Sequence, residues 1–495
     1  MFNQRSCVLR LAMAGVGLAG ALGISTARAD VVTEWNTIYI QTVRAVGGPP
    51  CPLSRSGAMM HVAMYDALEA IDRRYTPLVV RDVNPPQNAN RKAAIVGAAH
   101  RVLVNLYPAR TSIYDAAMTA SLAQIPAGPG RDAGVAVGEL VADHLIADHA
   151  SDTPYATDTN YVYVNVPGSY QPTFPDFTHP PFSPGWGQVK PWCMLNGSQY
   201  RPVNGPMGYT NINDLVLSAR YVEQFREVNL YGKRTSTLRS ADQTEIAWFW
   251  ANDRNGTYKP PGHINAIAQI ISNQNHLNLE QNARLFAMLN SAMADAGIMA
   301  WDAKFKTNID LWRPITAIRN ADTDGNPLTK ANRDWLPLLD FSPPFPGWMS
   351  GHASFGGAFA GVMRNFFGTD NMTFSCTSDE PASAGVVRTF HSFSQAGYED
   401  AESRIWLGVH FRADIEDGFA NGRRMADAMA TAFFTRTCRA DLTRDGAVTT
   451  SDMTYFTNAY FAGDATIADY NRDGTIDSTD AIEFMNDYLA GCHNQ

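Results

Sequence analysis

Apolar residues recur at steps of three and four positions along most of this chain, which is the spacing of amphipathic helices. The clearest stretches are residues 58–71, 133–150 and 282–301. Runs in which apolar and polar residues alternate, as they do in strands, are scarce. The sequence therefore predicts an all-α fold in which helices pack as bundles around a buried core.

The first 29 residues follow a different pattern, which is typical of a secretory signal peptide. Arg5 and Arg10 precede a short apolar run that ends at the small residues around Ala29. The run is too short to cross a membrane comfortably, so we expect cleavage before Asp30 and a secreted or periplasmic protein. No later segment has the length and apolar character of a membrane-spanning helix, so an integral membrane protein is not expected.

The remainder of the chain divides into three parts. Residues 30–235 are predicted as an N-terminal helical region, interrupted at 152–210 by a long loop rich in Pro, Gly and aromatic residues. Loops of this length usually have a function or wrap a surface. Residues 236–436 form a second helical region, in which residues 376–383 are a polar loop, and residues 438–492 form a small separate module.

Composition narrows the class of partner. The 495 residues are 45% hydrophobic and 18% charged, and the net charge is −9. An acidic chain without a basic run gives no footprint for nucleic acid, so no nucleic-acid partner is expected. Export permits disulfides, and Cys438 and Cys492, which flank the C-terminal module, are the favoured pair.

Three short clusters in the second helical region carry residues suited to an anion. They are Lys306 with Arg313-Pro314, Ser350-Gly351-His352, and Ser403-Arg404 with His410. Each cluster alone is a weak signal. Together, in this order and with these spacings, they indicate one site for a tetrahedral oxyanion such as phosphate or vanadate.

The residue types match what such an anion requires. An arginine offers a planar fork that meets two oxygens, and a lysine offers a compact charge. Gly351 precedes a run of small residues that reads as a helix, whose first amides are unpaired and unshielded by a side chain. Two histidines allow one to attack or ligate the central atom while the other moves protons.

The lysine of the first cluster has two candidates. Lys306 precedes Arg313 by seven positions, and two helical turns would place both on one face. Lys304 precedes Arg313 by nine positions and would lie on the opposite face of a continuous helix. The spacing therefore favours Lys306, with Lys304 as the alternative.

These clusters resemble the signature of the superfamily that unites vanadium-dependent haloperoxidases and type 2 phosphatidic acid phosphatases. The likeness covers roughly residues 31–436, and residues 393–418 resemble the bacterial haloperoxidase-like branch almost throughout. The stretches that carry it are residues 54–75, 245–271, 294–304, 311–319 and 393–418. The resemblance implies a catalytic fold made of a pair of helical bundles.

The resemblance also implies a role for each residue. His410 would bind vanadium axially in a haloperoxidase, or become the phosphohistidine of a phosphatase, and His352 would be the acid–base group. Phe345 would lie on the halide side, as in chloride-oxidising enzymes of the fungal type. The anion oxygens would be held by Lys306, Arg313, Ser350, the Gly351 amide and Arg404.

The resemblance leaves three functions open. The first is an exported haloperoxidase that uses vanadate and oxidises halide with hydrogen peroxide to hypohalous acid. The second is an exported acid phosphatase that hydrolyses phosphate esters at the same site. The third is a calcium-dependent scaffold protein whose catalytic domain is inactive.

The C-terminal module contains two loops, 28 residues apart, with the spacing of calcium loops. Oxygen ligands at positions 1, 3, 5, 9 and 12 with glycine at position 6 are the arrangement that surrounds Ca²⁺. Aspartate at position 12, followed by one helix per loop, resembles a dockerin module more than a paired EF-hand. We expect Ca²⁺ to fold this module and the module to contact another exported protein. The predicted ligands are Asp441, Thr443, Asp445 and Asp452 in the first loop and Asp469, Asn471, Asp473, Asp477 and Asp480 in the second.

Overall fold

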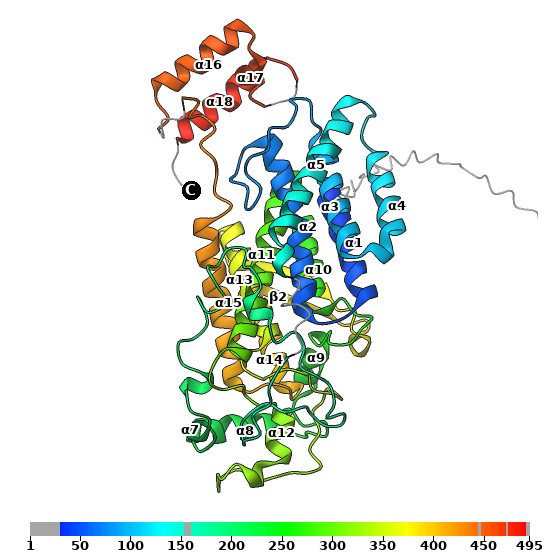
Figure 1. The fold of residues 1–495 in the computed structure, drawn as a ribbon, viewed down its shortest axis with the longest axis vertical. Helices are drawn as coiled ribbons and strands as arrows, with labels where there is room; N and C mark the ends of the chain where they lie inside the picture. The colour runs from blue at the N-terminus through cyan, green and yellow to red at the C-terminus, as the bar shows by residue number, and fades with distance from the viewer. Residues whose placement is uncertain (1–29, 153–159, 444–446, 472–473, 492–495) are drawn as a thin grey trace, which may run out of the picture.

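The computed structural model describes residues 30–152, 160–443, 447–471 and 474–491. The described chain is predominantly helical, which confirms the predicted fold class (Figure 1). The predicted signal peptide at residues 1–29 lies outside the described residues. No described helix is both long enough and apolar enough to cross a membrane.

The first helices of the chain lie side by side as one bundle (Figure 1). α2 is its centre because nearly every residue of this helix is buried, and it packs against α3, α5 and α11. Helix α3 in turn packs closely against α5. The bundle consists of α1 (Val31–Val46), α2 (Pro50–Asp72), α3 (Arg91–Leu106), α4 (Thr111–Leu122) and α5 (Pro129–Asp148).

The described part of the long loop wraps the outside of α11 (Leu279–Phe305). Its 3-10 turn at Trp186–Gln188 contacts α11, and the backbone amides of Trp192 and Cys193 each donate to the Asp295 carboxylate at 2.8 Å. The following elements are α7 (Ile212–Val216), α8 (Ala219–Tyr231), α9 (Ala241–Phe249), α10 (Lys259–Gln274) and α12 (Pro314–Arg319). Part of the loop thus lies against α11, and a functional role for it stays a prediction.

A second bundle forms around α13 (Gly351–Phe367), which packs against α11, α14 (Phe393–Trp406) and α15 (Arg412–Ala432). Glycines let these helices approach closely. A Cβ on Gly357 would lie 2.2 Å from the backbone oxygen of Phe419 in α15, a distance that no side chain tolerates. The small residues of α13 therefore set its distance from the neighbouring helices. The same packing fixes the position of the first turn of α13.

One short sheet interrupts the helical pattern. β1 (Asn371–Thr377) pairs antiparallel with β2 (Val387–Ser392), and the predicted polar loop at 376–383 lies at the turn end of this hairpin. The hairpin was missed because its strands expose most of their residues and present few apolar positions.

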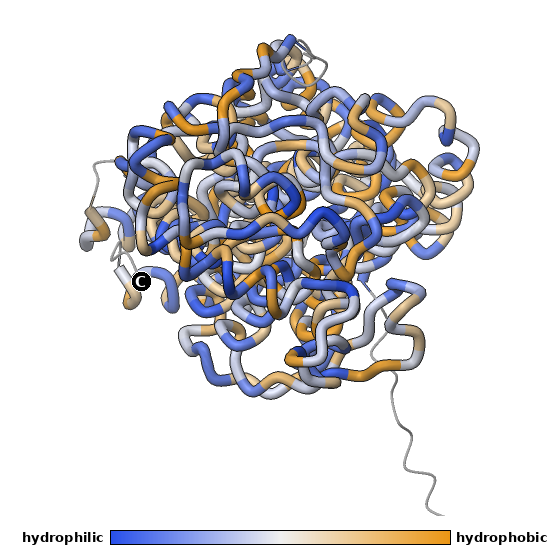
Figure 2. The backbone as a smooth tube through the Cα atoms, turned by 90° about the horizontal axis from the view of Figure 1, so that it is seen from below, coloured by the Kyte–Doolittle hydropathy of each residue, from blue (hydrophilic) through white to orange (hydrophobic). Residues whose placement is uncertain are grey.

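A single hydrophobic core runs from Val31 to Phe434 and joins both predicted helical regions. Its members come from helices on either side of residue 235, so the packing is continuous across that position. Figure 2 shows hydrophobic and hydrophilic residues following one another at short intervals along the tube, as amphipathic helices require.

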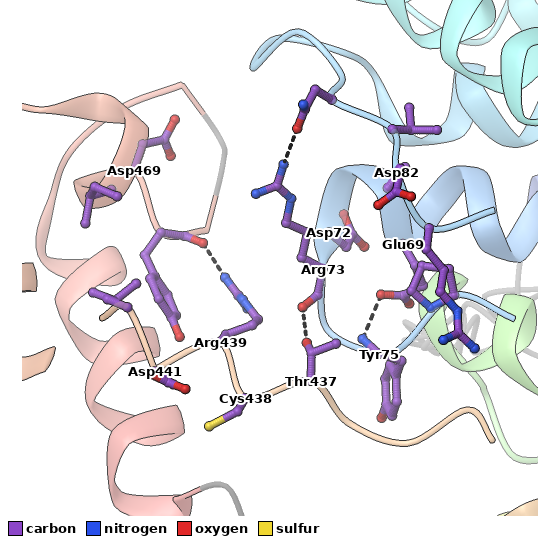
Figure 3. Close-up of a pocket in the computed structure, with 18 residues that line it drawn as sticks. Glu69, Asp72, Arg73, Tyr75, Asp82, Thr437, Cys438, Arg439, Asp441 and Asp469 are labelled. Carbon is purple, nitrogen blue, oxygen red and sulfur yellow. Dashed lines mark hydrogen bonds between the residues drawn. The ribbon is translucent and has the colours of Figure 1, made fainter. Parts of the chain in front are cut away.

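The C-terminal module has a core of its own, which consists of Ala440, Phe456, Tyr470 and Phe484 with partly buried neighbours. It contains α16 (Thr450–Ala462), α17 (Ala465–Ala468) and α18 (Ser478–Ala490), and it lies at the end of the molecule opposite α7, α8 and α12 (Figure 1). A cavity of about 500 Å³ separates it from the end of α2 (Figure 3). Cys438 is disulfide-bonded, while the predicted partner Cys492 lies outside the described residues.

Candidate active site

Helix ends bring six of the seven predicted anion-site residues together. Each is buried, and each sits at or beside the end of a helix. The six residues are Arg313 before α12, Ser350 as N-cap of α13, Gly351 and His352 in its first turn, Arg404 in the last turn of α14, and His410 between α14 and α15.

Four of these residues line a cavity of about 50 Å³: Gly351, His352, Arg404 and His410. A cavity needs only about 10–15 Å³ to admit a water molecule. The cavity is therefore large enough for a small ion and too small for an organic substrate of ordinary size.

The Arg313 guanidinium is held by two backbone carbonyls and by His410. Its Nε donates to the Phe345 carbonyl at 2.6 Å, and its Nη1 donates to the Val409 carbonyl at 2.8 Å and to His410 Nε2 at 3.0 Å. Its Nη2 is buried without a hydrogen-bond partner among the described residues.

The Arg404 guanidinium is hydrogen-bonded through Nη2 and has no partner for its other two nitrogens among the described residues. Its Nη2 donates to Asp253 Oδ2 at 2.7 Å, and its Nε and Nη1 are buried without a partner in the described chain. An unsatisfied buried donor costs roughly 1–3 kcal/mol, and more when the group is charged. The two arginines thus present three N–H-bearing atoms that an anion would satisfy.

The hydrogen bonds of His410 fix its tautomer. Arginine can only donate, so His410 Nε2 must be the acceptor of the bond from Arg313 and carries no proton. His410 Nδ1 then carries the proton and donates to Asp414 Oδ2 at 3.0 Å. A histidine whose outer nitrogen carries no proton and whose inner N–H is held by a carboxylate is suited to ligate a metal or to attack phosphorus.

His352 has the opposite tautomer. A carbonyl can only accept, so His352 Nε2 donates to the Ala251 oxygen at 3.1 Å. Nδ1 is then the nitrogen able to take a proton. Burial and then repulsion from Arg404 lower the pKa of His352 to about 3, so the imidazole is neutral at ordinary pH.

The structure buries Lys304, the alternative lysine, against the cluster and leaves the predicted Lys306 outside it. Lys306 is exposed, whereas Lys304 is fully buried and donates from Nζ to the carbonyls of Pro346 at 2.8 Å and Gly347 at 3.0 Å. The prediction assumed one helix from Lys306 to Arg313. α11 instead ends at Phe305, and Arg313 has an extended backbone before α12, so helical phase does not relate the two residues.

Phe345 forms part of the cavity wall beside these cations. Its ring centroid lies 4.8 Å from that of Trp301, and the Lys304 ammonium and the Arg313 guanidinium lie 5.1 Å and 4.7 Å from it. The ring excludes water from one side of the cluster and attracts the cations through its π face. Its position agrees with the predicted place beside the anion, while a halide role stays a prediction.

Charge repulsion makes this cluster receptive to an anion. Burial and then Arg313 lower the pKa of Lys304 far below its ordinary value, and burial lowers the pKa of Arg313 to about 10. Burial, followed by repulsion from Arg313, Lys304 and Arg404, also lowers the pKa of His410. A multiply charged anion would relieve this repulsion, so the residues present fit vanadate or phosphate.

Two carboxylates in this cluster were not predicted. Asp253 pairs with Arg404 across 151 positions of sequence, and although burial alone would raise its pKa, Arg404 holds it below the ordinary value. Asp414 accepts a hydrogen bond from the Nδ1–H of His410. Burial raises the pKa of Asp414 to about 7. The four-residue step from His410 to Asp414 was a visible signal, whereas nothing local pairs Asp253 with Arg404.

The predicted calcium loops have the same internal geometry. In the first loop Asp452 accepts from the amides of Thr443 at 2.8 Å and Thr449 at 2.9 Å. In the second loop Asp480 accepts from the amides of Asn471 and Asp477, both at 2.9 Å. The described residues contain no group of three acidic, histidine or cysteine side chains placed to hold a metal ion, and the predicted ligands Asp445 and Asp473 lie outside them.

Known proteins resemble this chain in sequence. Residues 284–437, which include every residue of the cluster except Asp253, match the family model described as the VCPO second helical-bundle domain. The chain is 29% identical over 500 residues to the vanadium chloroperoxidase of Curvularia inaequalis, covering 78% of this chain and 80% of that protein.

Solved structures show the same likeness. The crystal structure of the first bacterial vanadium-dependent iodoperoxidase is 28% identical, with a TM-score of 0.66, over 81% of this chain and 94% of that one. An apo-type bacterial vanadium-dependent chloroperoxidase shares the fold at 17% identity, with a TM-score of 0.60, over 78% of this chain and 94% of that one. Residues 284–437 therefore resemble the VCPO second helical-bundle domain, and the chain as a whole is similar in sequence and fold to vanadium haloperoxidases.

Proposed function

We propose that this protein is a vanadate-dependent haloperoxidase that oxidises halide with hydrogen peroxide. The observation that carries the proposal is the set of buried guanidinium atoms of Arg313 and Arg404 that have no partner among the described residues, together with the unprotonated Nε2 of His410, which Arg313 contacts. Vanadate, when bound, supplies a Lewis-acid centre that activates hydrogen peroxide toward attack by halide. His410 would ligate it, and the anion oxygens would be held by Lys304, Arg313, Ser350, the Gly351 amide and Arg404.

The chain's own residues have separable tasks. The arginines and Lys304 neutralise anion charge in a buried site, where their positions are fixed in advance and need no reorganisation. Asp414 keeps the proton of His410 on Nδ1, so the electron pair of Nε2 stays available. His352 receives the proton of the incoming peroxide at Nδ1, because its Nε2–H is engaged with Ala251.

The test compares the protein without vanadate and after vanadate loading. We expect halogenation that depends on both halide and peroxide only after loading, and none in the loaded His410→Ala variant. The exposed His391 of β2 gives a matched control, because His391→Ala removes an imidazole that does not line the small cavity. Phosphate-ester hydrolysis that vanadate inhibits, without any halogenation, would instead select the phosphatase alternative. Absence of vanadate binding would overturn both and favour the inactive scaffold.

For the C-terminal module we propose calcium binding and contact with another exported protein. Support comes from the repeated loop geometry and from the stacking of Phe456 on Phe484, whose rings are 4.1 Å apart and nearly parallel at 5°. We expect Ca²⁺ to raise the unfolding temperature of the module and Asp480→Asn to lower that gain. A melting curve unchanged by Ca²⁺ or by its chelation would refute this role. Export through the N-terminal signal is likewise proposed, and N-terminal sequencing of the secreted protein would test cleavage before Asp30.

A further inference from the structure

A second, larger cavity lies directly outside the small one. It has a volume of about 540 Å³ and is lined by aromatic rings from the long loop and from the segment before α13. The two cavities share a wall made of Gly48, Phe182, Asp253, Lys259, Phe341 and Pro344. Any ion that reaches the small cavity from this side passes along this shared wall.

Lys259 supplies the available positive charge on this wall. The other charged member is Asp253, whose carboxylate is engaged by Arg404 at 2.7 Å. The remaining charged groups of the outer cavity are paired with each other. Arg254 donates to Asp340 at 2.6 Å, and His179 lies 2.9 Å from Asp176.

The backbone holds the Lys259 side chain in place at some cost. Lys259 is the first residue of α10 and has a φ of +54°, a conformation that side-chain-bearing residues rarely adopt. It is only 5% exposed, and its Nζ donates to the Asp253 carbonyl at 2.6 Å. An ammonium has three N–H donors, so this bond leaves donors for another partner. Such strain persists only where the surroundings enforce it, and it clusters at functional sites.

Neighbouring carboxylates favour the charged form of Lys259, whereas burial disfavours it. Burial lowers the pKa of Lys259, while Asp253 and Glu380 act in the opposite direction. Glu380 lines neither cavity. The Lys259 ammonium therefore lies at the wall that the two cavities share, with Asp253 as the neighbouring carboxylate, and it keeps N–H donors for an anion.

We infer that the Lys259 ammonium and the aromatic side chains of the shared wall form a docking site for the halide ion, between the outer cavity and the oxyanion cavity. This inference rests on the proposed function. A halide is monovalent and large, and the positive edges of aromatic rings and one compact ammonium match it better than they match a multiply charged oxyanion. Charge on a narrow, low-dielectric wall also raises the local concentration of anions.

The first test is independent of catalysis. Crystals soaked in sodium bromide are measured at the bromine absorption edge, and we expect an anomalous peak in contact with Lys259 Nζ that is lost in Lys259→Met. Bromide found only elsewhere, or nowhere, overturns the inference whether or not the protein is a peroxidase. A peak at Lys259 in a protein that lacks peroxidase activity would leave the anion site standing and remove the proposed function.

The second test is kinetic and uses the vanadate-loaded enzyme. For Lys259→Met we expect the KM for bromide to rise about tenfold, with kcat, the KM for peroxide and the vanadate affinity unchanged, because uniform binding is lost. Lys259→Arg should restore part of the bromide affinity by retaining the charge. Lys92→Met, at an exposed lysine of α3, is the matched control. An unchanged bromide KM in a folded Lys259→Met protein would show that Lys259 only supports the Asp253 carbonyl.

Discussion

Replacement of Lys304 by methionine tests the corrected assignment of the site lysine. Methionine keeps an unbranched side chain of similar length and removes the charge. Lys304 is fully buried and is among the residues that lower the pKa of His410, so its field reaches the centre of the cluster. Lys306→Met is the matched control, because Lys306 is exposed two positions away.

The magnitude follows from Coulomb's law. Two unit charges about 4 Å apart interact by roughly 4 kcal/mol at an effective dielectric constant of ~20. The charge of an oxyanion is spread over several oxygens, so we take half of this value as the lower bound. A loss of about 2–4 kcal/mol weakens binding by about 30- to 1,000-fold.

The stability of the protein without anion should change much less. Lys304→Met removes two hydrogen bonds to backbone carbonyls, at Pro346 and Gly347. It also removes a buried cation whose pKa is lowered first by burial and then by Arg313. Relief of that buried charge offsets the lost hydrogen bonds, so we expect the variant to fold.

The assay is calorimetric titration with vanadate, repeated with inorganic phosphate. We expect Lys304→Met to lose affinity for both anions by the stated factor and Lys306→Met to match the wild type. Equal affinity of Lys304→Met and wild type, with weakened binding in Lys306→Met, would refute the structural assignment and restore the one drawn from spacing.

Three further predictions concern the surroundings of the site. Asp414→Asn should weaken vanadate binding by about 10- to 100-fold, measured by the same titration, because His410 loses the charged partner of its Nδ1–H. Burial lowers the pKa of His263 to about 4, against about 6.5 when unfolded, so the unfolded state takes up a proton first as pH falls. Denaturant unfolding at pH 7 and pH 4.5 measures how much unfolding free energy each protein loses on acidification. We expect this loss to be about 2 kcal/mol smaller in His263→Gln than in wild type. Equal losses in the two proteins would contradict the lowered pKa of His263. Gly357→Ala should lower the unfolding free energy by about 1–3 kcal/mol, because a Cβ would lie 2.2 Å from the Phe419 oxygen, and an unchanged denaturation midpoint would show that α13 can move away.

Local patterns in the sequence predict the fold class and most residues of the candidate site. Helical periodicity is written in neighbouring residues, and it predicted the fold class that the structure shows. The Ser-Gly-His and Ser-Arg clusters lie at helix ends, where six of the seven predicted residues converge. The hairpin at β1 and β2 escaped prediction because both strands are short and largely exposed, although β1 alternates exposed with less exposed residues.

Other features depended on where helices stop. Lys304 and Lys306 are chemically equal in sequence, and the end of α11 at Phe305 decides which one turns inward. Asp253 and Arg404 belong to segments 151 positions apart, and only the packing of the bundle brings them within 2.7 Å. The same holds for Lys259, which acquires its place between two cavities from segments on both sides of it.

The amino-acid sequence by itself determined the helical class, the inventory of cations and histidines, and their kinship with an anion-binding family, because these are properties of composition and short spacing. Tertiary structure alone decided which lysine faces the cluster, which nitrogen of each histidine holds its proton, and which arginine atoms stay unpaired. Those properties are set by hydrogen bonds between segments that are distant in sequence. Such a hydrogen bond forms only when folding brings its donor and its acceptor together in fixed positions.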